Sequence, residues 1–130
     1  FLENKTGRFN DVVHTFGAKG INMHAFSMAE RADFGILRLI VSDVDKAVEV
    51  LREKNFAVMS TDVVCLSCAN VPGSLAVVLE YLAEEQIFIE YMYAFAQADQ
   101  AHVVIKPNDM SQCLKVLEAH HCDVLAKVEL

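Results

Sequence analysis

Asn4-Lys5-Thr6-Gly7-Arg8-Phe9 recurs 66 residues later as Asn70-Val71-Pro72-Gly73-Ser74-Leu75, and this recurrence decides the fold. Each stretch opens a row of apolar residues spaced i, i+3, i+4 and i+7, the pattern of a helix with one buried face. A second row with this spacing follows at the same offset. The matched rows are Phe9, Val12, Val13 and Phe16 with Leu75, Val78, Leu79 and Leu82, and Val44, Ala47, Val48 and Leu51 with Met110, Cys113, Leu114 and Leu117. We therefore divide the chain into two repeats, residues 1–61 and 62–130.

Each repeat also predicts four strands around its two helices. Strand-like runs lie between the helices at 21–30 and 34–41, and at 87–96 and 101–105; others precede the first helices at 1–3 and 63–68, or follow the second at 56–60 and 122–128. Asp43 and Asp109 suit the start of the second helices, Pro72 suits a first helical position, and Thr6 could cap its counterpart. The order β-α-β-β-α-β is ferredoxin-like, an α+β fold with helices on one face of an antiparallel sheet.

The second long strand of each repeat is apolar on both faces. Residues 88–96 are apolar except at Glu90, and Met23, Ala25, Phe26 and Met28 behave similarly in the first repeat. Such a strand could be buried within one chain. Because helices cover only one face of this sheet, we instead expect a homo-oligomer, a dimer that packs the bare faces together.

The composition is that of a globular protein, with 54% hydrophobic and 22% charged residues. No apolar run reaches the ~18 residues of a membrane span. The net charge of −7, with Lys and Arg scattered, argues against a nucleic-acid partner. Four cysteines without a secretory signal suggest reduced thiols, so we predict a cytoplasmic protein. Phe1 already lies in a predicted strand, so we expect a few residues ahead of it.

The Asn-x-x-Gly turns are the strongest candidates for chemistry. Each joins a strand to a helix N-terminus, where unpaired backbone N–H groups and the helix dipole favour an anion. Glycine lets a ligand approach the backbone closely. A carboxylate fits such a turn, and an amino acid would supply one. The alternative is an ordinary strand-to-helix turn with Asn as a local cap.

These turns, set in β-α-β-β-α-β units, resemble those of the ACT domain family of amino-acid-binding regulatory modules. The resemblance extends to Gly20-Ile21-Asn22 and Leu37-Arg38-Leu39-Ile40-Val41 and covers the chain as a tandem pair. It implies that the units pair side by side into an eight-stranded antiparallel sheet. It also implies that amino acids bind at the seam, between the first turn of one unit and the second strand of its neighbour.

Carried over to this sequence, the resemblance implies two sites. The main site combines Asn70, Val71, Pro72, Gly73, Ser74 and Leu75 with Asn22, Met23 and His24, and the second combines Asn4, Lys5, Thr6, Gly7, Arg8 and Phe9 with Phe88, Ile89 and Glu90. Serine-binding members carry Asn both in the turn and at the position of Asn22. The second site has Phe88 there, which cannot replace an amide. We therefore predict one competent site and a degenerate twin. Strand alternation would put His24 on the same side as Asn22.

The other motifs are weaker indications of function. Cys65 and Cys68 have CxxC spacing, but residues three apart on a strand point to opposite faces, so we expect core residues. The cluster His120-His121-Cys122, with Cys113 near it, lies at a helix end and lacks a second ligand group. No nucleophile elbow, P-loop or dinucleotide fingerprint is present, so we predict no enzyme, metal or cofactor.

The leading hypothesis is a non-catalytic sensor that binds a free amino acid and regulates a partner, such as a metabolic enzyme. The alternative is a regulatory subunit whose ligand site has decayed.

Overall fold

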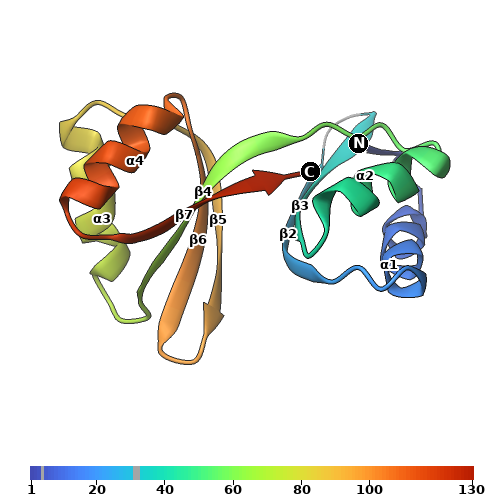
Figure 1. Ribbon diagram of the computed structural model, residues 1–130, viewed down its shortest axis with the longest axis horizontal. Helices are drawn as coiled ribbons and strands as arrows, with labels where there is room; N and C mark the ends of the chain where they lie inside the picture. Colours follow the sequence, from blue (N-terminus) through green and yellow to red (C-terminus); the bar gives the residue numbers. More distant parts are fainter. Residues whose placement is uncertain (4, 31–32) are drawn as a thin grey trace. The chain divides into compact units, whose positions relative to one another are not determined.

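The computed structural model describes residues 1–3, 5–30 and 33–130, which form seven strands and four helices (Figure 1). In chain order the elements are β1 (Leu2–Glu3), α1 (Arg8–Ala18), β2 (Met23–Glu30), β3 (Phe34–Val41), α2 (Val44–Glu53), β4 (Thr61–Ala69), α3 (Ser74–Glu84), β5 (Ile89–Gln97), β6 (Gln100–Pro107), α4 (Met110–Ala119) and β7 (Asp123–Glu129). None of the helices in these described ranges is both long and apolar enough to cross a membrane.

The elements form two compact units. Unit 1 comprises Phe1–Thr61 with Val128–Leu130, and unit 2 comprises Asp62–Lys127. The sheet of unit 1 has the strand order β1-β3-β2, and the second sheet has the order β5-β6-β4-β7. The α+β class and the two ferredoxin-like units are confirmed. The described strands form sheets of three and four strands, however, in place of the single eight-stranded sheet that we expected.

Each unit has its own apolar core between sheet and helices. In unit 1, Phe16 of α1 and Leu51 of α2 pack with Leu39 of β3. In unit 2, Leu82 and Leu117 belong to a second cluster of buried apolar residues, which also includes residues of the strands. Figure 1 shows α3 and α4 on one face of the sheet of unit 2. The helical stripes found in the sequence are therefore the core-facing sides of the helices, except that Val13 of α1 is 39% exposed.

The starts of the helices follow the predicted caps in two cases and differ in the other two. Asp43 and Asp109 are N-caps, and each carboxylate accepts a hydrogen bond from the backbone N–H three residues on, at 3.1 and 3.0 Å. Helix α1 begins after Gly7, so Thr6 is not its cap, and α3 begins after Gly73, so Pro72 is not its first residue. Both glycines have a left-handed backbone, with φ of 90° and 87°, which a side chain would strain.

Removing one of these aspartate caps is expected to destabilise the protein measurably. Asp109→Ala should lower the free energy of unfolding by about 1 kcal/mol, because the backbone N–H of Gln112 loses its acceptor. Urea unfolding measures the change. Glu118→Ala removes a carboxylate from the other end of the same helix and should leave the stability unchanged; equal losses in the two variants would contradict a capping role.

Residues 56–60 do not form the predicted strand, and β4 begins only at Thr61. In unit 2 the equivalent segment is β7, which pairs along the nine-residue β4. In unit 1 the strand that corresponds to β4 is β1, which has only two residues. So short an edge offers too few backbone partners to hold another strand.

Candidate ligand-binding site

The two strand-to-helix turns share the backbone hydrogen bonds around their glycines. In each, the residue after the glycine donates a 3.3 Å hydrogen bond to the carbonyl three residues back: Arg8 to Lys5, and Ser74 to Val71. The glycine carbonyl then accepts the first helical hydrogen bond. The next two backbone N–H groups of each helix lie too early for an intrahelical acceptor. Both turns therefore have the donors that an anionic ligand group requires.

The turn of unit 2 carries no charged side chain between Asn70 and Leu75. Asn70, Val71, Pro72 and Gly73 are exposed, and the backbone N–H of Asn70 is held by the carbonyl of Asp99 at 2.8 Å. Leu75 packs against the core of unit 2 and anchors the turn. Helix α3 has no acidic residue in its first turn. A ligand carboxylate would meet the positive end of this helix with no carboxylate of the helix competing for it.

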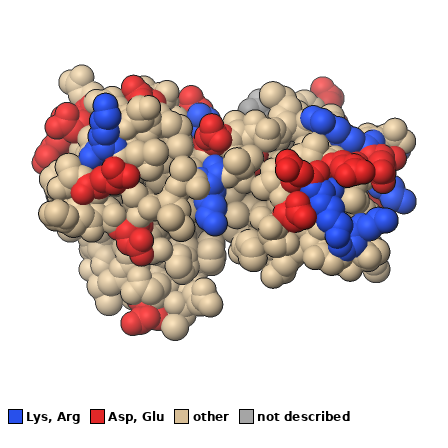
Figure 2. Space-filling model, viewed as in Figure 1, with Lys and Arg blue, Asp and Glu red and all other residues tan. Residues whose placement is uncertain are grey.

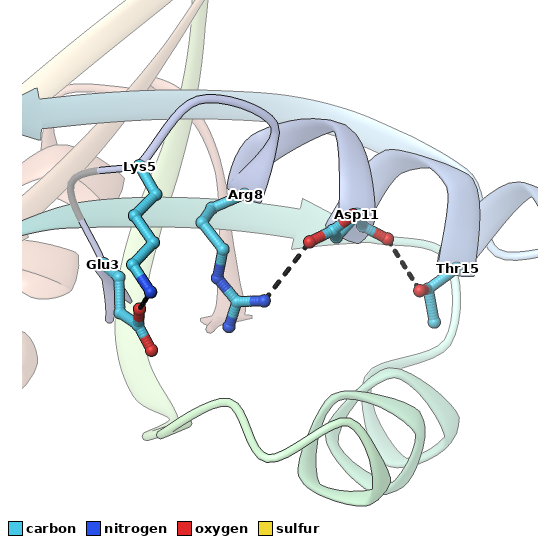
Figure 3. A network of polar contacts seen from close by, with 5 residues as sticks. All are labelled: Glu3, Lys5, Arg8, Asp11 and Thr15. Atoms are coloured by element: carbon cyan, nitrogen blue, oxygen red, sulfur yellow. Dashed lines mark hydrogen bonds and ion pairs between the residues drawn. The ribbon is translucent and has the colours of Figure 1, made fainter.

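The turn of unit 1 is instead surrounded by its own ion pairs (Figure 3). Lys5 Nζ lies 3.1 Å from Glu3 Oε2, and Arg8 Nη1 lies 3.2 Å from Asp11 Oδ2. The hydrogen bond from Lys5, followed by the positive charges of Lys5 and Arg8, lowers the pKa of Glu3. Asp11 also lies in the first turn of α1. The cationic side chains of this turn, Lys5 and Arg8, are thus already paired with carboxylates of the chain.

Arg8 is further fixed by an aromatic ring. Its guanidinium carbon lies 4.4 Å from the centroid of the Phe56 ring, a cation–π contact. The hydroxyl of Thr15 donates to the backbone carbonyl of Asp11 at 2.6 Å, which steadies the turn of helix that carries the Arg8 partner. In the second repeat the residues equivalent to Glu3, Lys5, Arg8 and Asp11 are Ala69, Val71, Ser74 and Val77. The charged network therefore distinguishes the first turn from the second.

The starts of β2 and β5 are braced in the same way. The backbone of Asn22 donates to Ser42 Oγ and accepts from the backbone of Ser42, both at 2.9 Å. The backbone of Phe88 makes the equivalent pair with Asn108, at 3.1 and 2.9 Å. Both braces use the backbone of the strand residue, and the side chains of Asn22 and Phe88 are exposed.

A β-bulge follows each brace. In β2 the register runs from Met23 opposite Val41 to Ala25 opposite Ile40, so His24 is an extra residue. In β5 the same shift makes Glu90 the extra residue. Because the bulge interrupts the ladder between Met23 and Ala25, strand alternation does not place His24 on the same side as Asn22. Bulges commonly re-aim a side chain beside a binding site.

A cleft of ≈ 520 Å³ in unit 1 joins the first turn to the far end of β2. Its lining includes Lys5, Thr6, Gly7, Arg8 and Phe9 on one side and Met28, Ala29 and Glu30 on the other. Met28 is 59% exposed and Phe26, 5.6 Å from Phe9 between ring centroids, is 54% exposed. Because of the bulge these two residues lie opposite the core residues Leu37 and Leu39 and share their face. We did not predict Phe26 and Met28 as residues of a site. Both can share a face with Met23 only if one residue between them is skipped, and this spacing is visible in the sequence.

The predicted sites each draw on both units. Asn70–Leu75 and Phe88–Glu90 belong to unit 2, whereas Asn22–His24 and the Lys5–Phe9 turn belong to unit 1. Each half has the local geometry given above. Asn4 lies outside the described residues.

The weaker motifs are placed by the register. Cys65 lies opposite Val104 and Cys68 opposite Ala101, on alternate faces of the sheet as we expected. Both thiols are only partly buried, so the expectation that they are core residues was wrong. Burial, and to a smaller extent Asp109, raises the pKa of Cys113 to about 11, so this thiol is protonated at neutral pH. Among the described residues no three His, Cys, Asp or Glu side chains are grouped to hold a metal ion. His120 stacks on Tyr81 with 3.7 Å between centroids.

The charged side chains do not separate by sign on the face shown in Figure 2. Over α1 and α2 of unit 1, Lys and Arg lie interspersed with Asp and Glu. Such a mixed surface lacks the continuous basic stripe that tracks a phosphate backbone.

Comparisons with known proteins agree with this architecture. The family model described as an ACT domain pair matches residues 1–130. The crystal structure of protein BT0572 from Bacteroides thetaiotaomicron is 53% identical; the match covers 96% of this chain and 87% of that one, with a TM-score of 0.92. The aspartokinase alpha and beta subunits are 18% identical over 92% of this chain and 86% of theirs, with a TM-score of 0.58, a likeness of fold. No curated protein matches.

Proposed function

The chain belongs to the ACT domain pair family over residues 1–130, and from this premise we propose that it is a non-catalytic sensor of a free amino acid. ACT domain pairs are regulatory modules. The finer proposal is that Asn70–Leu75 binds the ligand together with Asn22, Met23 and His24. The repeats 1–61 and 62–130 would each contribute half of this site.

The observation that carries the proposal is the difference between the two turns. Both offer backbone donors at a helix N-terminus, but among the described residues the first turn has ion pairs to Glu3 and Asp11, whereas the first turn of α3 has no acidic residue. The turn at Asn70 keeps its donors for a ligand carboxylate. Asn22, whose backbone is already braced, leaves its amide for the polar groups of the ligand.

The second site is proposed to be degenerate. It combines the charged turn Lys5–Phe9 with Phe88, Ile89 and Glu90, and Phe88 brings a ring where the main site has an amide. A ligand polar group left unpaired against that ring would lose its hydrogen bonds to water without replacement. A cleft remains beside this turn, but Lys5 and Arg8 in its lining already form ion pairs with Glu3 and Asp11.

Regulation is proposed to act through association. The helix-free face of the second sheet carries Tyr91, Tyr93 and Phe95, which lie opposite Lys106, Val104 and His102. We assign this face to a homodimer in the cytoplasm, with a metabolic enzyme as the regulated partner. Ligand binding would then shift the dimer or partner equilibrium by its preference for one state.

A thermal-shift screen of the twenty amino acids tests the proposal. A cognate ligand at 100 times its dissociation constant stabilises by about 2.7 kcal/mol, so a rise in Tm of several degrees is expected for one or a few amino acids. D-enantiomers are the matched control and should have no effect. A flat response to all twenty, with partner binding intact, would support a regulatory subunit with a decayed site instead.

A further inference from the structure

A cavity in unit 1 lies between α1 and the segment that follows α2. It measures ≈ 280 Å³, and its lining consists of Arg8, Asp11, His14, Thr15, Lys54 and Phe56. Arg8, Asp11 and Thr15 succeed one another along one side of α1 (Figure 3). The lining thus includes two cations, an imidazole that can become a third, and one carboxylate. Its charge balance is positive.

In unit 2 two stacked rings take the place of the smaller and more flexible side chains of this cavity. At the repeat offset, Thr15 corresponds to Tyr81. Lys54 corresponds in the same way to His120. The rings of Tyr81 and His120 are parallel to within 5° and stack with 3.7 Å between their centroids. Aromatic stacking packs the second helix of unit 2 against the first, whereas unit 1 has an open cavity at this position.

The chain path after the second helix does not explain the difference. In unit 1 the backbone N–H of Phe56 donates to the carbonyl of Leu51 at 3.0 Å. In unit 2 the backbone N–H of Cys122 donates to the carbonyl of Leu117 at 2.9 Å. The two helix ends therefore share this hydrogen bond at equivalent positions, and the units differ here in their side chains.

The repeats also differ in charge at this position. The residues of unit 2 that correspond to Arg8, Asp11 and His14 are Ser74, Val77 and Glu80. Unit 2 therefore has a carboxylate where unit 1 has an imidazole, and a hydroxyl where unit 1 has a guanidinium. Opening and positive charge occur together in unit 1, and together they favour an anionic ligand.

Two of the basic side chains are available to a ligand. Lys54 and His14 are exposed, and neither side chain has a hydrogen bond or an ion pair among the described residues. Arg8 is instead held in place by Asp11 and by the Phe56 ring. Its buried Nε has no hydrogen-bond partner in the part of the chain that the structure describes, so the guanidinium keeps an unused donor. The cavity thus combines one fixed cation with two adjustable groups.

We propose that this cavity binds the phosphate group of a small anion, with Arg8, His14 and Lys54 as its donors. A phosphate presents oxygens in several directions and accepts charge-assisted hydrogen bonds from guanidinium and ammonium groups. The donors come from the start of α1, from its middle and from the end of α2, so they reach the cavity from separate points. This site goes beyond the proposed amino-acid function, because it shares only Arg8 with the second amino-acid site and no residue with the main one.

Asp11 distinguishes a phosphate site from a cluster of charges that only stabilises the helix. Its carboxylate, 3.2 Å from Arg8 Nη1, offsets the charge of that guanidinium and repels an anion in the cavity. Asp11→Asn removes this repulsion and should strengthen phosphate binding by about threefold or more. An ion pair that served the stability of α1 alone would leave the affinity for phosphate unaltered when it is removed.

Titration of the full chain with inorganic phosphate and with glycerol 3-phosphate, at constant ionic strength, tests the proposal. NMR shifts of the amide and imidazole of His14 should saturate, with a dissociation constant of about 1 mM or below. Lys54→Gln is expected to weaken binding at least about fivefold. Lys115→Gln is the matched control, because it removes the same charge from an exposed position on α4 and should leave binding unchanged. Thr15→Tyr combined with Lys54→His copies the stacked pair of unit 2 and should abolish saturation with Tm little changed.

The two probes distinguish the sources of the phosphate group. Tighter binding of the ester would assign the cavity to a phosphorylated metabolite, and equal binding would assign it to free phosphate. Shifts that do not saturate, equal affinities in Lys54→Gln and Lys115→Gln, or no gain in Asp11→Asn would overturn the proposal. Displacement of phosphate by the amino acid found in the thermal-shift screen would also overturn it, because the cavity would then belong to the second amino-acid site. A flat screen leaves the phosphate titration interpretable, since the two ligands are separate.

Discussion

Asn70→Ala is expected to weaken binding of the cognate amino acid by about 10- to 100-fold, or roughly 1.4–2.8 kcal/mol, without lowering stability. The side chain of Asn70 is exposed, and the contact that fixes the residue to the fold is made by its backbone N–H with Asp99. Truncation therefore removes a partner of the ligand and leaves the turn in place. Isothermal titration calorimetry with the amino acid found in the screen measures the loss, and thermal unfolding verifies an unchanged Tm.

Asn4→Ala is the matched control, because Asn4 is the counterpart of Asn70 at the repeat offset. It should leave the affinity of the main site unaltered. Unchanged affinity in Asn70→Ala would remove Asn70 from the site, and an equal loss in both variants would show that the two turns work alike. The thermal-shift screen and this pair of variants test different claims. The screen tests whether any amino acid binds, and Asn70→Ala tests whether Asn70 contributes to that binding.

Phe16→Ala is expected to lower the free energy of unfolding by about 3–5 kcal/mol, the largest stability change foreseen for this chain. Phe16 is 1% exposed and is the largest fully buried side chain in the core of unit 1. Its counterpart Leu82 is equally buried in unit 2, and Leu82→Ala should cost about 2–5 kcal/mol. Both changes leave cavities that the surrounding helices and strands can close only in part.

Urea unfolding followed by circular dichroism measures both losses, and amide exchange assigns each to its unit. Val13→Ala on the same helix as Phe16 is the control, because Val13 is partly exposed and should cost under about 1 kcal/mol. A loss below 1 kcal/mol for Phe16→Ala would mean that the apolar stripe of α1 does not face the core.

The sequence predicted the parts of the fold that depend on local pattern. The stripes gave all four helices, Asp43 and Asp109 gave two helix starts, and the run at 34–41 coincides with β3. The strand predicted at residues 56–60 does not form because a strand needs a neighbour to pair with, and β1 has only two residues. The helix starts at Gly7 and Gly73 were misjudged because a left-handed N-cap depends on the path of the incoming chain rather than on capping propensity.

The candidate site was likewise predictable only where it depends on a local sequence pattern. The two Asn-x-x-Gly turns were visible as motifs, but the ion pairs of Glu3 with Lys5 and of Asp11 with Arg8 depend on side-chain placement that no spacing rule provides. The bulges at His24 and Glu90 were missed because period-two counting assumes an unbroken ladder. The bulge at His24 is indicated in the sequence by the apolar residues Phe26 and Met28, which lie an odd number of positions after Met23 and so break the period-two spacing.

The braces of Asn22 by Ser42 and of Phe88 by Asn108 bear on how a duplicated protein diverges. Each brace fixes the strand through main-chain atoms, so selection is free to exchange the side chain at that position without disturbing the sheet. One copy of a duplicated gene segment can then keep an amide while the other drifts to a phenyl ring, and the fold tolerates both. The same separation of scaffold from side chain means that Phe88→Asn should introduce an amide at this position without disturbing the sheet.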